Sequence, residues 1–182
     1  MFKKLNILDE KEKSLRKKSV EATFPLPQEY KDLVQRSIDE LTYSQIDEYA
    51  KKYDLRPGMG LAFPQLGINK RIIVIVYEVD DGVFDEYVMV NPKIVSYSKE
   101  EIAAEAGEGC LSVNREIEGH IKRYARITVE GYDLEGNKIR VRAREELSIA
   151  FQHEIDHLDG ILFFDRIDPK HRFYKEYELR LI

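Results

Sequence analysis

The chain has 182 residues, of which 43% are hydrophobic and 35% are charged, as is typical of a globular protein. This length predicts one domain, residues 1–182. The formal net charge of −5 disfavours DNA as a partner, because binding to phosphates requires a concentrated basic face. No apolar run is long enough to span a bilayer, the first residues lack the apolar core of a signal peptide, and a single cysteine excludes an internal disulfide. We therefore expect a cytoplasmic protein that makes no contact with membranes.

The first half of the chain predicts a helix followed by strands. Hydrophobic residues recur with helical spacing after two prolines and predict an amphipathic helix over residues 28–53. A glycine-rich loop follows, GMGLAFPQLG at residues 58–67. The run RIIVIVYEV, residues 71–79, predicts a buried strand, and residues 86–98 predict further extended structure beyond the turn DDG.

The second half predicts a β-hairpin and a second helix. Residues 122–134 and 138–144 predict two strands joined by the turn EGN, the clearest hairpin signal in the chain. Apolar residues on one side of SIAFQHEIDHLDGILF, residues 148–163, predict a helix that ends near Gly160. The fold class is therefore α+β, with an N-terminal helix and mostly antiparallel strands around a central helix.

The second predicted helix carries a motif typical of metal sites, His153-Glu154-x-x-His157. Residues four apart lie on one face of a helix, so both imidazoles can bind one ion. Glu154 follows the first histidine and suits a general base that acts on a metal-bound water. The alternative is a helix with two surface histidines and an unrelated glutamate.

A catalytic site of this kind needs a third protein ligand, which the motif itself does not supply. One class of metalloproteases adds a third histidine, but Phe163 occupies that position. Glu176 or Glu178 would complete the set in a different metallopeptidase, although both lie in a charged tail that is typical of a solvated surface. Cys110, flanked by two glycines, would supply a thiolate instead. Both alternatives remain open on these residues alone.

Three segments in this order, GMGLAFPQLG, EGCLS and QHEIDH, resemble the signature motifs of the peptide deformylase family. The resemblance covers about residues 4–170, and DDGVFDEY, KEEIAAEAG and VNPKIVSYS resemble its longer, type 2-like bacterial subgroup. It implies the deformylase α+β fold, with antiparallel β-sheets around the central HExxH helix and an N-terminal helix. It also implies one catalytic domain.

The resemblance implies a hydrolase that removes the N-terminal formyl group from formylmethionyl nascent polypeptides and releases formate. The nucleophile would be a metal-bound water activated by Glu154, and Gln65 and the backbone N–H of Leu111 would bind the developing oxyanion. The implied cofactor is one divalent ion, Fe²⁺, which Zn²⁺, Ni²⁺ or Co²⁺ can replace. The implied metal ligands are Cys110, His153 and His157.

The resemblance also implies a substrate site. An extended edge near the start of the glycine-rich loop would add the peptide as a further strand. An apolar pocket would hold the methionine side chain, although its residues can equally be ordinary core. The predicted substrate-binding residues are Gly58, Met59, Gly60, Leu61, Ile149 and Ala150.

Several residues depart from the family pattern or extend it. Phe63 occupies a position where the family usually has alanine, so it either narrows the pocket or packs outward. Glu145 and Glu146 replace apolar residues at the pocket rim. A buried pair between Glu108 and Arg123 is a further expectation.

Two more interpretations stay open. If the metal is structural and Phe63 obstructs attack, the chain is a non-catalytic module that binds formylmethionyl peptides. The basic residues of the predicted hairpin either contact the ribosome, near the exit of the nascent chain, or form an ordinary solvated strand face. These residues are Arg140, Arg142 and Arg144.

Overall fold

The computed structural model describes residues 2–182. The helices are α1 (Gln28–Ser44), α2 (Asp47–Tyr53) and α3 (Glu145–Leu158), the strands are β1 (Gly60–Ala62), β2 (Ile72–Asp80), β3 (Val83–Tyr97), β4 (Glu101–Ala103), β5 (Arg123–Tyr124), β6 (Arg126–Tyr132), β7 (Lys138–Arg144) and β8 (Arg180–Leu181), and short 3-10 helices span Lys13–Arg16, Phe63–Leu66 and Phe163–Arg166.

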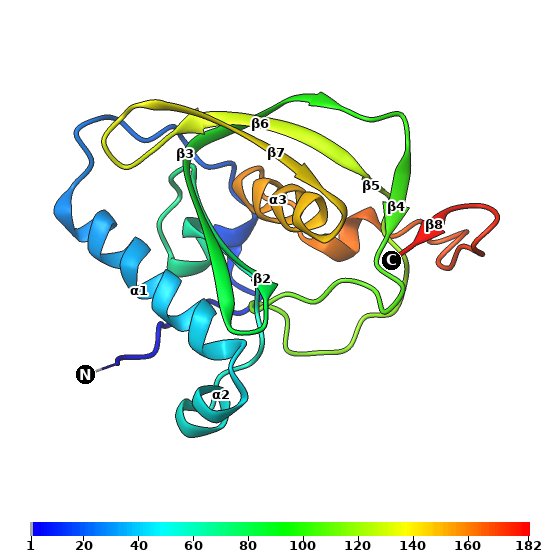
Figure 1. The fold of residues 1–182 in the computed structure, drawn as a ribbon, viewed down its shortest axis with the longest axis horizontal. Helices are drawn as coiled ribbons and strands as arrows, with labels where there is room; N and C mark the ends of the chain where they lie inside the picture. Colours follow the sequence, from blue (N-terminus) through cyan, green and yellow to red (C-terminus); the bar gives the residue numbers. More distant parts are fainter. Residues whose placement is uncertain (1) are drawn as a thin grey trace.

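The strands form two sheets. The main sheet is antiparallel, in the order β1-β2-β3-β6-β7, and the smaller sheet has the order β5-β4-β8, with β4 and β8 parallel. Figure 1 shows α3 lying inside the curve of the main sheet and α1 on the outside of β2 and β3. The arrangement agrees with the predicted α+β class and with the predicted central helix.

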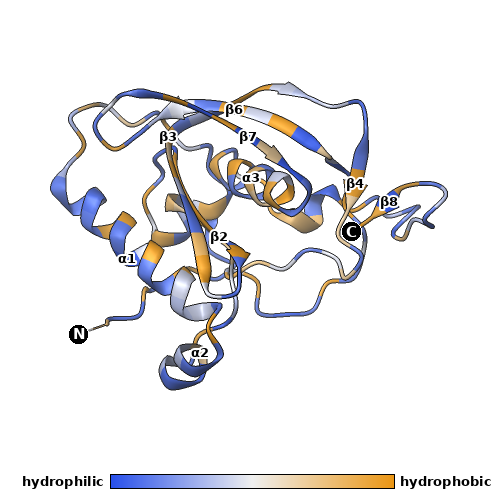
Figure 2. Ribbon diagram, viewed as in Figure 1, coloured by the Kyte–Doolittle hydropathy of each residue, from blue (hydrophilic) through white to orange (hydrophobic). Residues whose placement is uncertain are grey.

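The first five residues of strand β2 are buried on both faces, which explains their uninterrupted apolar run. Ile72, Val74 and Val76 share a core with the apolar face of α1, whereas Ile73 and Ile75 share a core with α3. Successive side chains of a strand point to opposite faces, so one strand serves both cores. Full burial of each such side chain contributes about 1.5–3 kcal/mol. Figure 2 shows the result, with β2 and much of α3 hydrophobic and α1 mixed.

The prediction of a single helix over residues 28–53 is wrong in one respect, because the structure has two helices there, α1 and α2. The chain is extended at Ile46, between α1 and α2. Gln45 donates its side-chain amide to the Val76 carbonyl of β2 (3.1 Å), and the buried Ser44 hydroxyl accepts the Gly58 N–H (3.1 Å). These bonds fasten the end of α1 to the main sheet and to the segment before β1. A local apolar pattern does not reveal such side-chain bonds.

The predicted glycine-rich loop is wrong for Gly60–Ala62, which forms strand β1. It pairs with β2 as an edge strand of the main sheet, with Leu61 opposite Val74. A 3-10 helix, Phe63–Leu66, follows directly. The predicted extended edge is therefore present, although two of its glycines made the sequence resemble a loop.

The other predicted elements are confirmed with shifted ends. Strand β3 continues through the region predicted as extended, with a change of register between Val90 and Lys93 where Pro92 lies, as expected for a proline within a sheet. The hairpin strands are β6 and β7, but Arg123 and Tyr124 pair with β4 instead. Helix α3 begins at Glu145, earlier than expected. No helix among the described residues is long and apolar enough to cross a membrane.

Candidate active site

The side chains of Cys110, His153 and His157 lie together in the structure. Their ligand atoms all lie within 4.8 Å of one another, and they are the one such group of three found among residues 2–182. The Cys110 Sγ and His157 Nε2 atoms are 3.2 Å apart. Helix α3 presents both histidines on one face, and the loop between β4 and β5 brings the thiol to them. The structure thus brings the three predicted ligands together.

The hydrogen bonds of the two imidazoles fit a metal ion. His153 Nδ1 lies 2.9 Å from the Glu108 carboxylate, which leaves its Nε2 atom for an ion. His157 is buried and turns its Nε2 atom to the Cys110 thiol, whereas its Nδ1 atom, on the other side of the ring, has no hydrogen-bond partner among the described residues. One thiolate and two imidazoles suit zinc, iron, nickel or cobalt. The donor set therefore fits a transition metal and leaves coordination positions for other groups.

The carboxylate of Glu154 lies beside this group and is almost fully buried. Burial raises its pKa to about 7, and its Oε2 atom has no partner within the described part of the chain. Strand β1 approaches it closely, because a Cβ atom added to Gly60 would lie 2.3 Å from Glu154 Oε1. A buried carboxylate that is not hydrogen-bonded can exchange protons with a reacting group.

The predicted oxyanion donors flank Cys110. Gln65 is buried, accepts the Ala62 N–H (2.8 Å) and donates to Ser112 Oγ (3.1 Å), so its amide is oriented with the N–H₂ group toward the thiol. The Leu111 N–H donates to no protein acceptor among residues 2–182. Arg56 donates to the carbonyls of Leu111 and Val113 and so fastens this loop. Neither Arg56 nor Ser112 was predicted from the sequence, although Ser112 is the last residue of the EGCLS motif.

A cleft of about 520 Å³ leads to these residues. Its lining includes most of the predicted substrate-binding residues, namely Gly58, Met59, Gly60, Ile149 and Ala150, and also Arg56, Leu111 and Glu146. Leu61 does not line it, because alternation along β1 turns its side chain into the core shared with α1. Leu61 was predicted to bind substrate through the backbone of the extended edge, and that stays a prediction.

Phe63 and Glu145 lie away from the cleft. The Phe63 ring is fully buried and meets Tyr30 of α1 edge to face, with ring centroids 5.6 Å apart. The ring packs against α1, away from the cleft. It therefore neither narrows the cleft nor obstructs attack on a bound substrate. Glu145 pairs with Arg180 of β8 at 2.8 Å. Glu146 alone of the two predicted rim acids faces the cleft.

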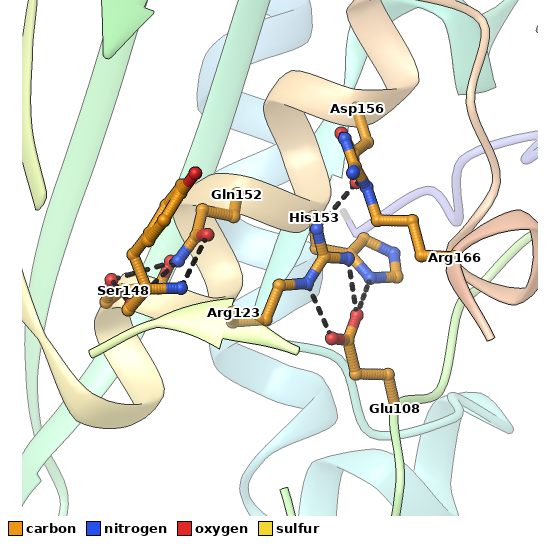
Figure 3. Close-up of polar contacts among 8 residues, drawn as sticks. Glu108, Arg123, Ser148, Gln152, His153, Asp156 and Arg166 are labelled. Atoms are coloured by element: carbon orange, nitrogen blue, oxygen red, sulfur yellow. Dashed lines mark hydrogen bonds and ion pairs between the residues drawn. The ribbon is translucent and has the colours of Figure 1, made fainter. Parts of the chain in front are cut away.

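A buried ion network supports the histidines (Figure 3). Arg123 donates to Glu108 (2.7 Å), which confirms the predicted pair, and to Asp156 (2.6 Å). Burial raises the pKa of Glu108, but the hydrogen bonds from Arg123 and His153 outweigh it and lower the pKa to about 2. Arg166 also bonds Asp156. Asp156 and Arg166 were not predicted from the sequence, although Asp156 lies three residues after His153 and so on the same helix face.

The C-terminal glutamates do not belong to the site. Glu176 is exposed, and Glu178 accepts the Lys175 N–H (2.9 Å) and lies 3.6 Å from His171 Nε2. Neither takes part in the group of possible metal ligands. The peptidase alternative therefore has no third ligand in this arrangement.

This donor set, with a free buried carboxylate at the end of a cleft, is typical of metal-dependent hydrolases. A family model described as Polypeptide deformylase matches residues 4–173. Peptide deformylase 2 of Geobacillus stearothermophilus is 44% identical over 168 residues, 92% of this chain and 91% of that protein. The peptide deformylase of Shouchella clausii is 47% identical over 154 residues, 85% of this chain and 84% of that protein.

The fold is similar as well. A crystal structure of peptide deformylase from Thermotoga maritima has a TM-score of 0.71 and 32% identity, covering 91% of this chain and 98% of that one. The chain belongs to the peptide deformylase family. It is therefore a metal-dependent hydrolase that removes the N-terminal formyl group from nascent polypeptides.

Proposed function

We propose that Cys110, His153 and His157 hold the ion required for deformylation and that Glu154 moves the protons. The observation that carries this assignment is the grouping of the three ligand atoms within 4.8 Å, beside a buried carboxylate oxygen that has no partner among residues 2–182. A divalent ion held there lowers the pKa of water and polarises a carbonyl group. Glu154 takes a proton from the attacking water and delivers one to the leaving amine.

Gln65 and the Leu111 N–H stabilise the oxyanion in this proposal. The formyl oxygen gains negative charge during attack, and donors already aimed at it lower the barrier. Gln65 is held by bonds to Ala62 and Ser112, so its amide needs no reorganisation during the reaction. Loss of one such donor typically costs about 10²–10³ in rate.

The substrate backbone lies along β1 in this proposal, as an added antiparallel strand. Strand β1 is an edge strand, and edge strands carry unpaired backbone groups that a peptide can bind. The methionine side chain enters the apolar part of the cleft between Met59, Ile149 and Ala150. A structure of the Acinetobacter baumannii enzyme, 27% identical with a TM-score of 0.72, is described as bound to Met-Ala-Ser.

We infer that the resident ion is Fe²⁺. The thiolate and imidazole donors accept iron, zinc, nickel and cobalt, so the donor set alone does not select one. Protein loaded separately with each ion should be most active with iron, nickel or cobalt and less active with zinc, and the iron form should lose activity in air as its thiolate oxidises. Equal activity with all four ions would count against this inference.

The ligand assignment is tested by metal content together with formate release. Cys110→Ser should bind iron or zinc weakly and release little formate from a formyl-Met peptide, whereas Glu176→Ala should behave as the unmodified protein. Metal content that survives in Cys110→Ser and falls in Glu176→Ala would support the peptidase alternative. Binding of formyl-Met peptides without formate release by the iron-loaded protein would indicate a non-catalytic module.

The ribosome, in the cytoplasm, is the proposed site of action. On β7 the outward side chains are all basic and exposed, and Arg144 lies directly opposite Arg126 of β6. Arg126 pairs with Glu100 (2.9 Å) and Arg140 pairs with Glu130, whereas no ion pair within residues 2–182 involves Arg142 or Arg144. These two arginines are the cations of this face that RNA phosphates would bind. The alternating residues of this basic row are Lys138, Arg140, Arg142 and Arg144.

Co-sedimentation with ribosomes tests this contact. The double variant Arg142→Gln and Arg144→Gln should sediment less at low salt than the unmodified protein, because phosphate binding weakens as charges are lost. The matched control is Lys51→Gln with Lys52→Gln on α2, which removes the same charge elsewhere. Equal sedimentation of both double variants would mean that the basic row is only a solvated strand face.

A further inference from the structure

Arg123 joins the two segments that carry the metal ligands of the proposed function. Its Nε and one terminal nitrogen donate to both oxygens of Glu108, at 2.7 and 2.9 Å, and its other terminal nitrogen donates to Asp156 at 2.6 Å. Glu108 lies two residues before Cys110, and Asp156 lies between His153 and His157 on α3. Figure 3 shows the guanidinium between the two carboxylates, with Glu108 also reaching the His153 ring.

The contacts form one continuous path from the arginine to the ligands. Glu108 Oε2 receives a bond from Arg123 and lies 2.9 Å from His153 Nδ1. The same carboxylate therefore orients an imidazole and is itself oriented by a planar fork. Removal of such a supporting bond typically lowers metal affinity or activity by about 10–100-fold.

The charges of this network balance. Glu108 and Asp156 supply two buried negative charges, and Arg123 and Arg166 supply two positive charges. The Arg123 side chain is only 2% exposed, whereas that of Arg166 is 43% exposed. Two buried carboxylates need paired cations, since an unpaired buried charge is strongly destabilising. Arg166 thus completes the pairing from the surface, while Arg123 makes the link inside.

We propose that Arg123 is a positioning residue for the metal centre, which sets the spacing between the Cys110 thiolate and the two histidines. This role rests on the proposed ligand set. It requires the geometry of a guanidinium, because one planar group bonds two carboxylates at once. A lysine in its place supplies the charge without the fork.

The test compares Arg123→Lys with a control that breaks another arginine–carboxylate pair, one made at the end of helix α3. Arg71→Gln is that control, because Arg71 pairs with Asp159 at the end of α3 (2.8 Å) and touches no ligand. Arg123→Lys should bind Zn²⁺ about 10–100-fold more weakly in competition with a chelator. The visible absorption bands of its Co²⁺ form should shift, and kcat should fall more than KM rises. Arg71→Gln should keep the affinity and the spectrum.

A purely structural role would give a different result. Arg123→Lys with a lower melting temperature but unchanged Zn²⁺ affinity and Co²⁺ spectrum would overturn the proposal. If Arg123→Lys does not fold, Asp156→Asn decides, because it weakens one of the two carboxylate contacts that Arg123 bridges. Weaker Zn²⁺ binding in that variant supports the proposal, and unchanged binding contradicts it.

Cys110→Ser, measured in parallel, separates this proposal from the ligand assignment. If Cys110→Ser binds Zn²⁺ as tightly as the unmodified protein, the ligand assignment fails. If it loses Zn²⁺ while Arg123→Lys does not, the ligand assignment stands and only the positioning role fails.

Discussion

The site depends on the absence of a side chain at Gly60 as much as on the residues that react. A Cβ atom there would lie 2.3 Å from Glu154 Oε1 and 2.8 Å from its carboxyl carbon. No real Cβ atom approaches a neighbour so closely, so the strand or the carboxylate would have to move. In the sequence this glycine indicated only a loop or a close backbone approach.

Gly60→Ala should therefore displace Glu154 and lower kcat. A misplacement of about 1 Å in a catalytic group can cost about 100-fold in rate. The matched control is Gly109→Ala, where an added Cβ would meet no atom within 4 Å. The measurement is the rate of formate release per bound metal ion. Equal rates for the two variants would show that strand β1 does not position Glu154.

Glu146 adds a negative charge to the rim of the cleft, which otherwise is predicted to bind an apolar methionine side chain. It is exposed at the cleft rim, and no ion pair involves it among residues 2–182. An unpaired carboxylate there attracts cationic substrate residues. Interactions between exposed charges are typically about 0.2–1 kcal/mol, so the effect on selectivity is modest.

Glu146→Gln should reduce the preference for formyl-Met peptides that carry lysine, relative to those that carry glutamate, after the methionine. The expected change in the ratio of kcat/KM values is about twofold to fivefold at low salt, and it should vanish at high salt. Glu145→Gln is the control, since that acid pairs with Arg180 instead of facing the cleft. An unchanged ratio in Glu146→Gln would remove Glu146 from substrate selection.

At the scale of elements, the short 3-10 helix Phe63–Leu66 carries one residue of the core and one residue of the candidate active site. Phe63 points into the core beneath α1, whereas Gln65, two residues later, points to the thiol of Cys110. The sequence left the direction of Phe63 open because its local pattern is neither a strand nor a regular helix. Only the pairing of β1 with β2 sets which side each residue faces.

Phe63→Ala should consequently lower stability far more than catalysis. Removing a buried phenylalanine costs about 3–5 kcal/mol in the free energy of unfolding, while the cleft lining stays intact because Phe63 is not part of it. Urea unfolding monitored by circular dichroism, together with kcat on the folded protein, measures both effects. A large rise in kcat with unchanged stability would instead mean that the ring obstructs the site.

The elements also show what the sequence predicted well and what it missed. Periodicity located α1, the hairpin and α3, because each buries a regular apolar face, and the uninterrupted apolar run located β2, whose two faces belong to two cores. Other features depend on partners distant in sequence. The helix break after Ser44 depends on bonds to Gly58 and Val76, and the strand Gly60–Ala62 depends on pairing with β2. The local sequence pattern of an element does not reveal bonds to such distant partners.

Across the whole molecule, the two sheets and α3 bring together residues far apart in sequence. Cys110 comes from the loop between β4 and β5, and the histidines come from α3. The ordered motifs predicted this ligand set without the fold. The supporting Arg166 could not be found that way, since nothing near it in the sequence marks a partner for Asp156. That residues 1–182 form a single catalytic domain stays a prediction.

The most direct test of the account is formate release by the Glu154→Gln variant. Glutamine keeps the size of the side chain and removes its ability to take a proton, and general acid–base catalysis typically contributes about 10²–10⁴ in rate. The iron-loaded variant should therefore keep its metal and release formate from a formyl-Met peptide at least about 100-fold more slowly. Full metal content with a rate near that of the unmodified protein would contradict the role proposed for Glu154.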